Sequence, residues 1–423
     1  MSEFNLGRRR IMQIAGAGLL MPSLAPAVIA SVKDRPQLTD GVQSGDLLGD
    51  KAMIWSRSDR PARMVVEWDT RSMFSNPRRS VSPLADARTD FTARVELTGL
   101  PANQAIFYRV TFEDAQSGAA SEPWFGHLRS APSQRRDIRF VWSGDTVGQG
   151  FGINPDIGGM RIYEAMRLRL PDFFIHSGDT IYADGPVPAQ LTVEDGRIWR
   201  NLTTEAKSKV AETLDEYRGN YRYNLMDENL RRFNAEVPQI WQWDDHEVVN
   251  NWSPSKQLDE RYVVKDIQTL VGRARQAWLE YSPMRRQSAD GGGRIYRKLS
   301  YGPLLDVFVL DMRSYRGPND DNLGGEKPFL GREQLDWLKR ELKDSSAQWK
   351  VVAADMPIGL GVPDGEVSPG VARWEAIANG DPGSAQGREL EIAELLAYLR
   401  KHQVRNHVWL TADVHYCAAH HYH

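Results

Sequence analysis

The sequence predicts two folded parts, an all-β sandwich followed by a larger layered α/β domain. The length of 423 residues exceeds that of one ordinary domain. Between about Val42 and Ala131, short runs of strand-forming residues are separated by turns, which is typical of a sandwich. After Pro132, apolar runs of strand length alternate with amphipathic segments, which indicates a sheet covered by helices.

The composition excludes several classes of protein. Hydrophobic residues make up 41% of the chain and charged residues 26%, which excludes intrinsic disorder. The formal net charge is −3, so no basic excess indicates nucleic acid as the principal partner. The single cysteine, Cys417, can form neither an intramolecular disulfide nor a thiolate zinc cluster. Any metal must therefore be held by oxygen and nitrogen.

Residues 1–30 have the pattern of an export signal. Three arginines at 8–10 precede an apolar stretch, and small residues at 25–27 offer a cleavage site. The paired arginines resemble a twin-arginine signal, which would make that export machinery a partner; an ordinary secretory signal is the alternative. No other stretch is long and apolar enough to cross a bilayer. We therefore expect a periplasmic or secreted protein whose mature form has no membrane span.

The first folded part is predicted to cover residues 36–133. Leu97, Leu100 and Tyr108 are spaced as in fibronectin type III-like modules, in which a tyrosine locks the turn before a late strand. This resemblance concerns the fold alone. No catalytic cluster of residues is evident in this part of the sequence.

Six apolar runs are predicted to be buried strands of the second part, residues 137–423. They are Ile138–Trp142, Phe173–His176, Gln239–Trp243, Leu305–Leu310, Trp349–Ala353 and His407–Leu410. Each is followed by carboxylate, imidazole or guanidinium side chains. Because an open α/β sheet binds its ligand beyond the carboxyl ends of its strands, these side chains are expected to converge on one site.

The side chains that follow the strands suit a metal centre. One acidic residue after a strand usually caps a helix or forms a turn, but several carboxylates in one pocket repel each other unless cations neutralise them. With two imidazoles added, the set suits first-row divalent or trivalent ions rather than calcium alone. A carboxylate that bridges two such ions would support hydrolysis by a metal-bound hydroxide. The side chains at the strand ends are Asp145, Asp179, Asp244, Asp245, His246, Glu247, Asp311, Arg313, Asp355, Asp413 and His415.

Four motifs resemble those of the PhoD-like alkaline phosphatases, within the calcineurin-type metallophosphoesterase fold. They are FIHSGDTIYAD, QWDDHEVVNNW, VLDMRSYRG and LTADVHY. The resemblance covers nearly the whole chain, because a leader, a β-sandwich and a metallophosphoesterase domain follow each other in that family's order. It implies a layered α/β (α+β) metallophosphoesterase-like domain, preceded by the fibronectin type III-like sandwich.

The resemblance also implies roles for individual residues. Asp179 occupies the position of the bridging carboxylate, and Tyr182 matches a tyrosine that ligates ferric iron, with a packed aromatic as the alternative. Asp245 would be a ligand of the second metal. His246 would contact the phosphoryl oxygens or protonate the leaving group.

The remaining assignments concern the later motifs. Asp413 and His415 stand at the last metal-binding motif, and Asp355 stands where a histidine ligand is usual, although it could equally be a turn residue. Arg313 is a candidate phosphate clamp, because guanidinium matches phosphate oxygens bidentately. The alternative for Arg313 is an ion pair with Asp311 or a neighbouring acid.

The sequence departs from the family pattern in two places. Well-known members have an iron-binding cysteine at the first motif, where this chain has Asp145. The resemblance implies iron and calcium in a site of two or more metal ions, and Asp145 keeps zinc and manganese open as alternatives. The chain also ends soon after His415, so we expect the second domain to be incomplete at its C-terminus.

The sequence therefore predicts a secreted, metal-dependent phosphoesterase of the alkaline phosphatase type. Its substrate would be a small-molecule, lipid or nucleotide phosphoester, with monoesters as the first expectation. A phosphodiesterase or phospholipase D-type enzyme on the same site is one alternative. A non-catalytic secreted binding protein is the other.

Overall fold

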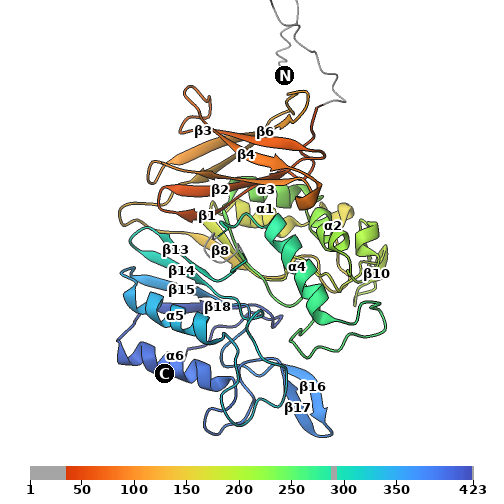
Figure 1. The fold of residues 1–423 in the computed structure, drawn as a ribbon, viewed down its shortest axis with the longest axis vertical. Helices are drawn as coiled ribbons and strands as arrows, with labels where there is room; N and C mark the ends of the chain where they lie inside the picture. The colour runs from red at the N-terminus through yellow and green to blue at the C-terminus, as the bar shows by residue number, and fades with distance from the viewer. Residues whose placement is uncertain (1–34, 287–292, 422–423) are drawn as a thin grey trace, which may run out of the picture.

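The computed structural model describes residues 35–286 and 293–421, and the chain forms stacked layers of sheet and helix (Figure 1). The predicted export signal lies outside the described residues. Within the described residues, no helix combines the length and the apolar character that a membrane span requires. From the N-terminal end, Figure 1 shows the sandwich, then the strands of the second part, then the helices α5 and α6 at the far side.

The sandwich consists of two antiparallel layers. One is a four-stranded sheet in the order β4-β3-β6-β7, and the other is formed by β5, β2 and β1. Ile54, Met64 and Phe112 are completely buried between the layers. The strands are β1 (Val42–Leu48), β2 (Lys51–Arg57), β3 (Ala62–Asp69), β4 (Arg78–Ala85), β5 (Thr92–Leu97), β6 (Ala105–Asp114) and β7 (Trp124–Arg129).

The first sheet continues from the sandwich into the second part of the chain. Its order is β5-β2-β1-β12-β9-β8, and β1 pairs in parallel with β12 through Gly45 and Gln239. A side chain at Gly45 would lie 2.7 Å from the carbonyl oxygen of Gln239, so the close pairing requires glycine. The added strands are β8 (Phe140–Ser143), β9 (Phe173–Ser177) and β12 (Gln239–Gln242). The two parts therefore share one sheet.

Tyr108 takes a different part in the fold from the one expected. Its side chain is completely buried, and its hydroxyl donates to the carbonyl oxygen of Ala235 at 2.8 Å. Ala235 belongs to α3, in the second part of the chain. Because the shared sheet places α3 against the sandwich, the tyrosine bonds to the neighbouring domain instead of closing a turn within its own.

A second sheet packs face to face with the first. Its order is β13-β14-β15-β18, with β13 antiparallel to β14 and the other pairs parallel. Ile175 of the first sheet and Val307 of the second belong to the same completely buried core. The strands are β13 (Arg297–Tyr301), β14 (Leu305–Val309), β15 (Trp349–Ala353) and β18 (His407–Leu410). All six predicted strands are thus present, with bounds that differ by no more than two residues.

Helices cover the outer faces of both sheets (Figure 1). The 3.6-residue spacing of leucines in the sequence predicts that one face of each of α5 and α6 packs on the core. Leu335, Leu338 and Leu342 of α5 are buried as predicted, whereas Leu396 of α6 is 41% exposed although Ile392 and Leu399 on the same helix are buried. Leu396 therefore lies at the edge of the apolar face of α6 and not within it. The helices are α1 (Arg161–Arg167), α2 (Leu214–Asn224), α3 (Glu228–Glu236), α4 (Ile267–Tyr281), α5 (Arg332–Asp344) and α6 (Glu389–Lys401).

Two short hairpins stand on the side of the molecule where the strands end (Figure 1). One is formed by β10 (Gln190–Thr192) and β11 (Ile198–Arg200), and the other by β16 (Pro363–Ser368) and β17 (Val371–Trp374). Single-turn 3₁₀ helices complete the regular structure at Ala87–Thr89, Pro155–Ile157 and Glu205–Lys207.

Candidate metal centre

Three aspartates follow strands of the two sheets in an unusual backbone conformation. Asp145, Asp179 and Asp413 have φ angles of 60°, 53° and 64°, in the left-handed region. Residues other than glycine adopt this conformation at an energetic cost, and such strain is concentrated at functional sites. Gly178, at the end of β9, allows Asp244 to approach closely, because a side chain at Gly178 would lie 2.3 Å from Cβ of Asp244. The backbone thus aims the three carboxylates at one region.

The structure brings seven residues from the strand ends together in three overlapping groups: the six to which the resemblance gives roles at the metals or the phosphoryl group, and Asp244. Within each group, the atoms that could bind a metal lie within 4.8 Å of one another. Asp179 is shared by the first two groups and Asp245 by the last two, as bridging carboxylates would be. The groups are Asp145 with Asp179 and His415; Asp179 with Asp245 and His246; and Asp244 with Asp245 and Asp413.

Tyr182 and Gln149 surround the first group. The Tyr182 hydroxyl donates to Oδ1 of Asp145 at 2.8 Å and lies 3.4 Å from Nε2 of His415. Its ring stacks on that of His246 with 4.1 Å between centroids. The side-chain amide of Gln149 is 2.9 Å from Nδ1 of His415. Tyr182 is therefore within reach of an ion in this group, whereas Gln149 was not anticipated from the sequence.

His246 in the second group is held by a carboxylate that the sequence did not single out. Its Nδ1 lies 2.7 Å from Oδ1 of Asp184, and the other oxygen of Asp184 accepts the backbone N–H of Asn250. Although burial opposes the charged imidazole, the carboxylates of Asp245 and Asp184 raise the pKa of His246 to about 9. Asp184 closes the motif FIHSGDTIYAD, so its place in that motif was the available signal.

Glu247 ties the ends of β9 and β12 together. Its carboxylate accepts the backbone N–H groups of Asp179 at 3.0 Å, Thr180 at 2.6 Å and Asp244 at 2.7 Å. It is completely buried. Because these bonds fix the backbone on both sides of the second group, Glu247 positions ligands instead of joining them. It ends the run Asp-Asp-His-Glu, but nothing in the sequence distinguished its role from that of its neighbours.

Arg313 is buried among carboxylates and has no exposed surface. Its guanidinium donates to Asp244 at 2.7 Å, to Asp355 at 3.1 Å and to Asp413 at 3.0 Å. It also pairs with Glu375, which was not predicted because it belongs to none of the four motifs. This placement favours the ion-pair interpretation of Arg313 over the phosphate clamp. Asp355 likewise faces Arg313 and belongs to none of the three groups formed by the described residues.

The carboxylates of this region lie so close together and so deeply buried that their negative charges repel one another. Burial first, and then the charges of Asp244 and Asp245, raise the pKa of Asp179 well above its usual range. Burial and the charge of Glu375 do the same for the pKa of Asp413. Negative charges packed in this way are stabilised by protons or by metal ions. The carboxylates outnumber the arginines beside them, and all the possible ligand atoms are oxygen or nitrogen. The residues present therefore fit a centre of several metal ions.

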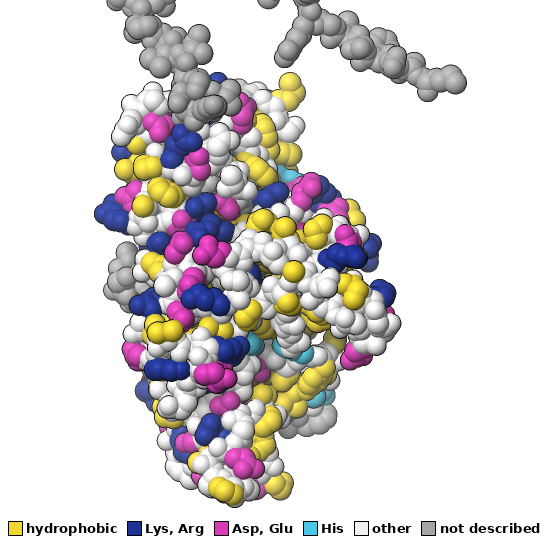
Figure 2. Space-filling model, turned by 90° about the vertical axis from the view of Figure 1, so that its right-hand side faces the viewer, with side chains coloured by type: hydrophobic (Ala, Val, Ile, Leu, Met, Phe, Trp, Pro, Cys, Tyr) yellow, Lys and Arg dark blue, Asp and Glu magenta, His cyan; other side chains and the backbone are white. Residues whose placement is uncertain are grey.

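The site opens to solvent on the side of the first group. The side chains of Asp145 and His415 are 38% and 41% exposed. Figure 2 views this side of the molecule and shows histidine side chains around a hollow in its surface. A substrate therefore has access to the first group from this side.

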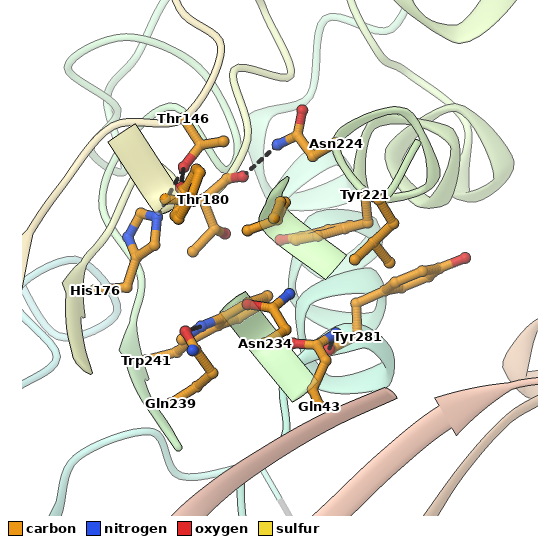
Figure 3. Close-up of a pocket in the computed structure, with 13 residues that line it drawn as sticks. Gln43, Thr146, His176, Thr180, Tyr221, Asn224, Asn234, Gln239, Trp241 and Tyr281 are labelled. Atoms are coloured by element: carbon orange, nitrogen blue, oxygen red, sulfur yellow. Dashed lines mark hydrogen bonds between the residues drawn. The ribbon is translucent and has the colours of Figure 1, made fainter. Parts of the chain in front are cut away.

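A separate enclosed cavity lies behind the loops that carry the candidate ligands (Figure 3). Thr146 and Thr180, which follow Asp145 and Asp179, form part of its wall, and His176 bonds to Thr146 at 2.9 Å. The space open to the centres of water molecules is about 20 Å³. That volume accommodates a buried water but no phosphoester, so this cavity is no substrate pocket.

Comparison with known proteins identifies the chain's relatives. Residues 140–423 match the model of the PhoD-like phosphatase family, and residues 23–132 match that of the PhoD-like phosphatase N-terminal domain. Alkaline phosphatase D of Bacillus subtilis (strain 168) is 27% identical over 448 residues, covering 96% of this chain and 71% of the relative.

Two solved structures resemble the fold. The structure of PhoD superposes with a TM-score of 0.70 at 25% identity, covering 89% of this chain and 72% of the other. Purple acid phosphatase PPD1 from yellow lupin (Lupinus luteus) seeds has a TM-score of 0.54 at 14% identity, covering 90% and 58%. The second likeness shows the fold alone: a layered metallophosphoesterase-like domain, which the sequence predicted.

Proposed function

The chain belongs to the PhoD-like phosphatase family, and from this premise we propose that it hydrolyses phosphate monoesters at the candidate metal centre, after export from the cytoplasm. The observation that carries the proposal is the chain of three ligand groups linked by Asp179 and Asp245. A carboxylate shared by neighbouring ligand groups could bridge two metal ions, and paired ions suit metal-assisted phosphoester hydrolysis.

The three groups define which residues would hold metal ions. Asp145, Asp179 and His415, with Tyr182 at their side, would hold the most accessible ion, and the other two groups would hold its neighbours. Bound metal ions supply Lewis acidity and an activated water for attack on phosphorus. Because Asp145 stands in the position of a cysteine, all donors are oxygen or nitrogen. Iron and calcium are the proposed ions, with zinc and manganese as alternatives.

The residues that surround the three ligand groups hold the ligands and His246 in position. Since Asp184 holds Nδ1 of His246, only Nε2 can face a metal or the substrate. Glu247 fixes the backbone of Asp179 and Asp244. Arg313 neutralises part of the negative charge from inside the cluster and is too deeply buried to contact phosphate unless its ion pairs break. The chain therefore keeps an excess of negative charge for cations.

Export rests on the sequence of residues 1–30. The arginines at 8–10 and the apolar stretch that follows support transport by the twin-arginine route, which carries folded proteins. A variant with lysines at positions 8 and 9 is expected to accumulate in the cytoplasm of a bacterial host, whereas the unchanged chain reaches the periplasm. Equal export of both forms would favour the ordinary secretory signal.

Asp179→Asn is the variant that tests the proposed activity. We expect it to lose hydrolysis of an aryl phosphate, because its side chain keeps the shape but not the charge of a bridging ligand. Asp266→Asn is the matched control: it makes the same change at the N-cap of α4, where asparagine is an equally good cap. Full activity of Asp179→Asn would overturn the proposal.

The choice of substrate separates the monoesterase from its alternatives. We expect the unchanged protein to hydrolyse an aryl phosphate monoester faster than the corresponding diester. The reverse order would favour a phosphodiesterase or phospholipase D-type enzyme. A folded protein that hydrolyses neither ester would favour the non-catalytic binding protein.

A further inference from the structure

We propose that Phe151 and Trp199 form an apolar wall beside the candidate metal centre, which receives the leaving group of the substrate and selects phosphoesters of aromatic or other apolar alcohols. This inference rests on the proposed function. The two rings meet edge to face, with 5.4 Å between centroids and an interplanar angle of 83°. Phe151 is 37% exposed, so part of its ring is available to a ligand.

The loop that carries Phe151 lies against the candidate metal centre. Gly148 packs on the ring of Tyr182, because a side chain at that position would lie 2.6 Å from the ring. The next residue, Gln149, contacts His415. The N–H of Phe151 then donates to the carbonyl oxygen of Gly148 at 2.9 Å, which closes a tight turn. Such a turn keeps its first and last Cα atoms within about 7 Å, so Phe151 stays close to Tyr182.

Asn201 fixes this loop to the β10–β11 hairpin that carries Trp199. Its amide nitrogen donates to the carbonyl oxygens of Gly150 at 2.8 Å and Pro188 at 2.7 Å. Its oxygen accepts the N–H of Gly152 at 2.7 Å and the indole N–H of Trp199 at 2.8 Å. Both ends of one side chain thus hold the two segments together. The aromatic pair is therefore set in place before a substrate binds, which lowers the entropy cost of binding.

The wall complements the charged side of the site. The carboxylates and imidazoles of the three ligand groups are suited to metal ions and to the phosphoryl group they bind, whereas the two rings offer a surface for carbon. A phosphoester has the same division, with a charged phosphate and an organic alcohol. The alcohol that gains most from the rings is itself aromatic or apolar, and a small polar alcohol such as glycerol gains little.

The experiment compares two esters in three proteins. We would measure kcat/KM for phenyl phosphate and glycerol 2-phosphate with the unchanged protein, Phe151→Ala and Phe125→Ala. Phe125 is the matched control, because it forms a similar exposed edge-to-face pair with Phe74 in the sandwich, at 6.2 Å and 60°. Metal content is measured for each protein, so that a loss of ligands is detected separately.

Phe151→Ala is expected to lower kcat/KM for phenyl phosphate about tenfold, mainly through KM, and to change that for glycerol 2-phosphate less than about twofold, with unchanged metal content. Phe151→Leu keeps an apolar surface and should recover part of the loss, and Phe125→Ala should change neither rate. An equal loss for both esters, or no loss, would overturn the inference. If the unchanged protein hydrolyses neither ester, the proposed function itself has failed.

Discussion

The junction between the two parts of the chain and the candidate metal centre both bury carboxylates, but they balance the charge differently. At the junction, Asp46 of β1 meets Arg297 of β13 at 2.7 Å. Glu280 of α4, whose carbonyl oxygen accepts the indole N–H of Trp55 in the sandwich, meets Arg218 of α2 at 2.7 Å. Each of these two acids thus has one arginine. At the centre, Arg313 faces five carboxylates and shares only one of them, Glu375, with a second arginine, Arg316. Burial and acidic neighbours raise the pKa of Asp179 well above its usual range. The charges at the junction are balanced by the protein alone, whereas those at the centre are balanced only when cations bind.

The largest effect on stability is expected at the junction. Arg297→Met leaves Asp46 buried without its partner, which should lower the free energy of unfolding by about 3–5 kcal/mol. Urea denaturation measures this change, and it should be the same with and without metal. Arg79→Met, which breaks the exposed pair with Glu113, serves as the control and should cost less than about 1 kcal/mol. Equal effects of the two variants would mean that the buried pair does not hold the junction.

A smaller effect is expected from pH and, unlike the first, it should depend on metal. Burial raises the pKa of Glu247 to about 7 and that of Asp355 to about 6. The metal-free folded state therefore binds more protons than the unfolded state between about pH 4 and 7, so its stability should fall by about 1–3 kcal/mol as pH rises through this range. Melting temperatures in a chelator measure the fall, and added metal should reduce it. If the stability of the metal-free protein rose with pH over this range, the centre would not carry an excess of negative charge.

The sequence could predict most of the centre, because its motifs lie at strand ends. Asp145, Asp179 and Asp413 follow strands whose apolar pattern is clear, and parallel strands bring such residues to one edge. The burial of Arg313 could not be predicted, since a guanidinium after a strand suits phosphate and carboxylate equally. The pairing of β1 with β12 was missed because it joins segments about 190 residues apart, with no local signal in either.

Residues that support the ligands were the hardest to foresee. Gln149 and Glu375 come from loops without periodicity, and only the folded chain places them beside His415 and Arg313. Tyr108 has the spacing of a turn-locking residue, yet the neighbouring helix offered its hydroxyl another acceptor. Local patterns specify strands and motifs, whereas contacts between distant loops depend on tertiary structure.

The smallest expected effect concerns Gln149, whose φ of 56° also lies in the left-handed region. His415 can bind a metal through Nε2 only if Nδ1 carries the proton. The amide nitrogen of Gln149 lies 2.9 Å from Nδ1, so the amide would turn its oxygen to this atom to accept that proton when metal binds. Gln149→Ala should weaken metal binding about tenfold, and Gln149→Glu should restore it. Titration of metal into protein that a chelator has freed of metal measures the affinity of both variants. Unchanged affinity in Gln149→Ala would show that the contact does not orient His415.

The central claim is that the carboxylate excess exists to hold cations, and the direct test is the metal content of the purified protein. The protein is equilibrated with iron, calcium, zinc and manganese in turn, dialysed, and subjected to elemental analysis beside Asp179→Asn and Asp266→Asn. We predict at least two tightly held ions per chain in the unchanged protein and in Asp266→Asn, and a loss of bound metal in Asp179→Asn, because that residue is shared by two ligand groups. A folded, unchanged protein that retains no stoichiometric metal under any of these conditions would contradict the account.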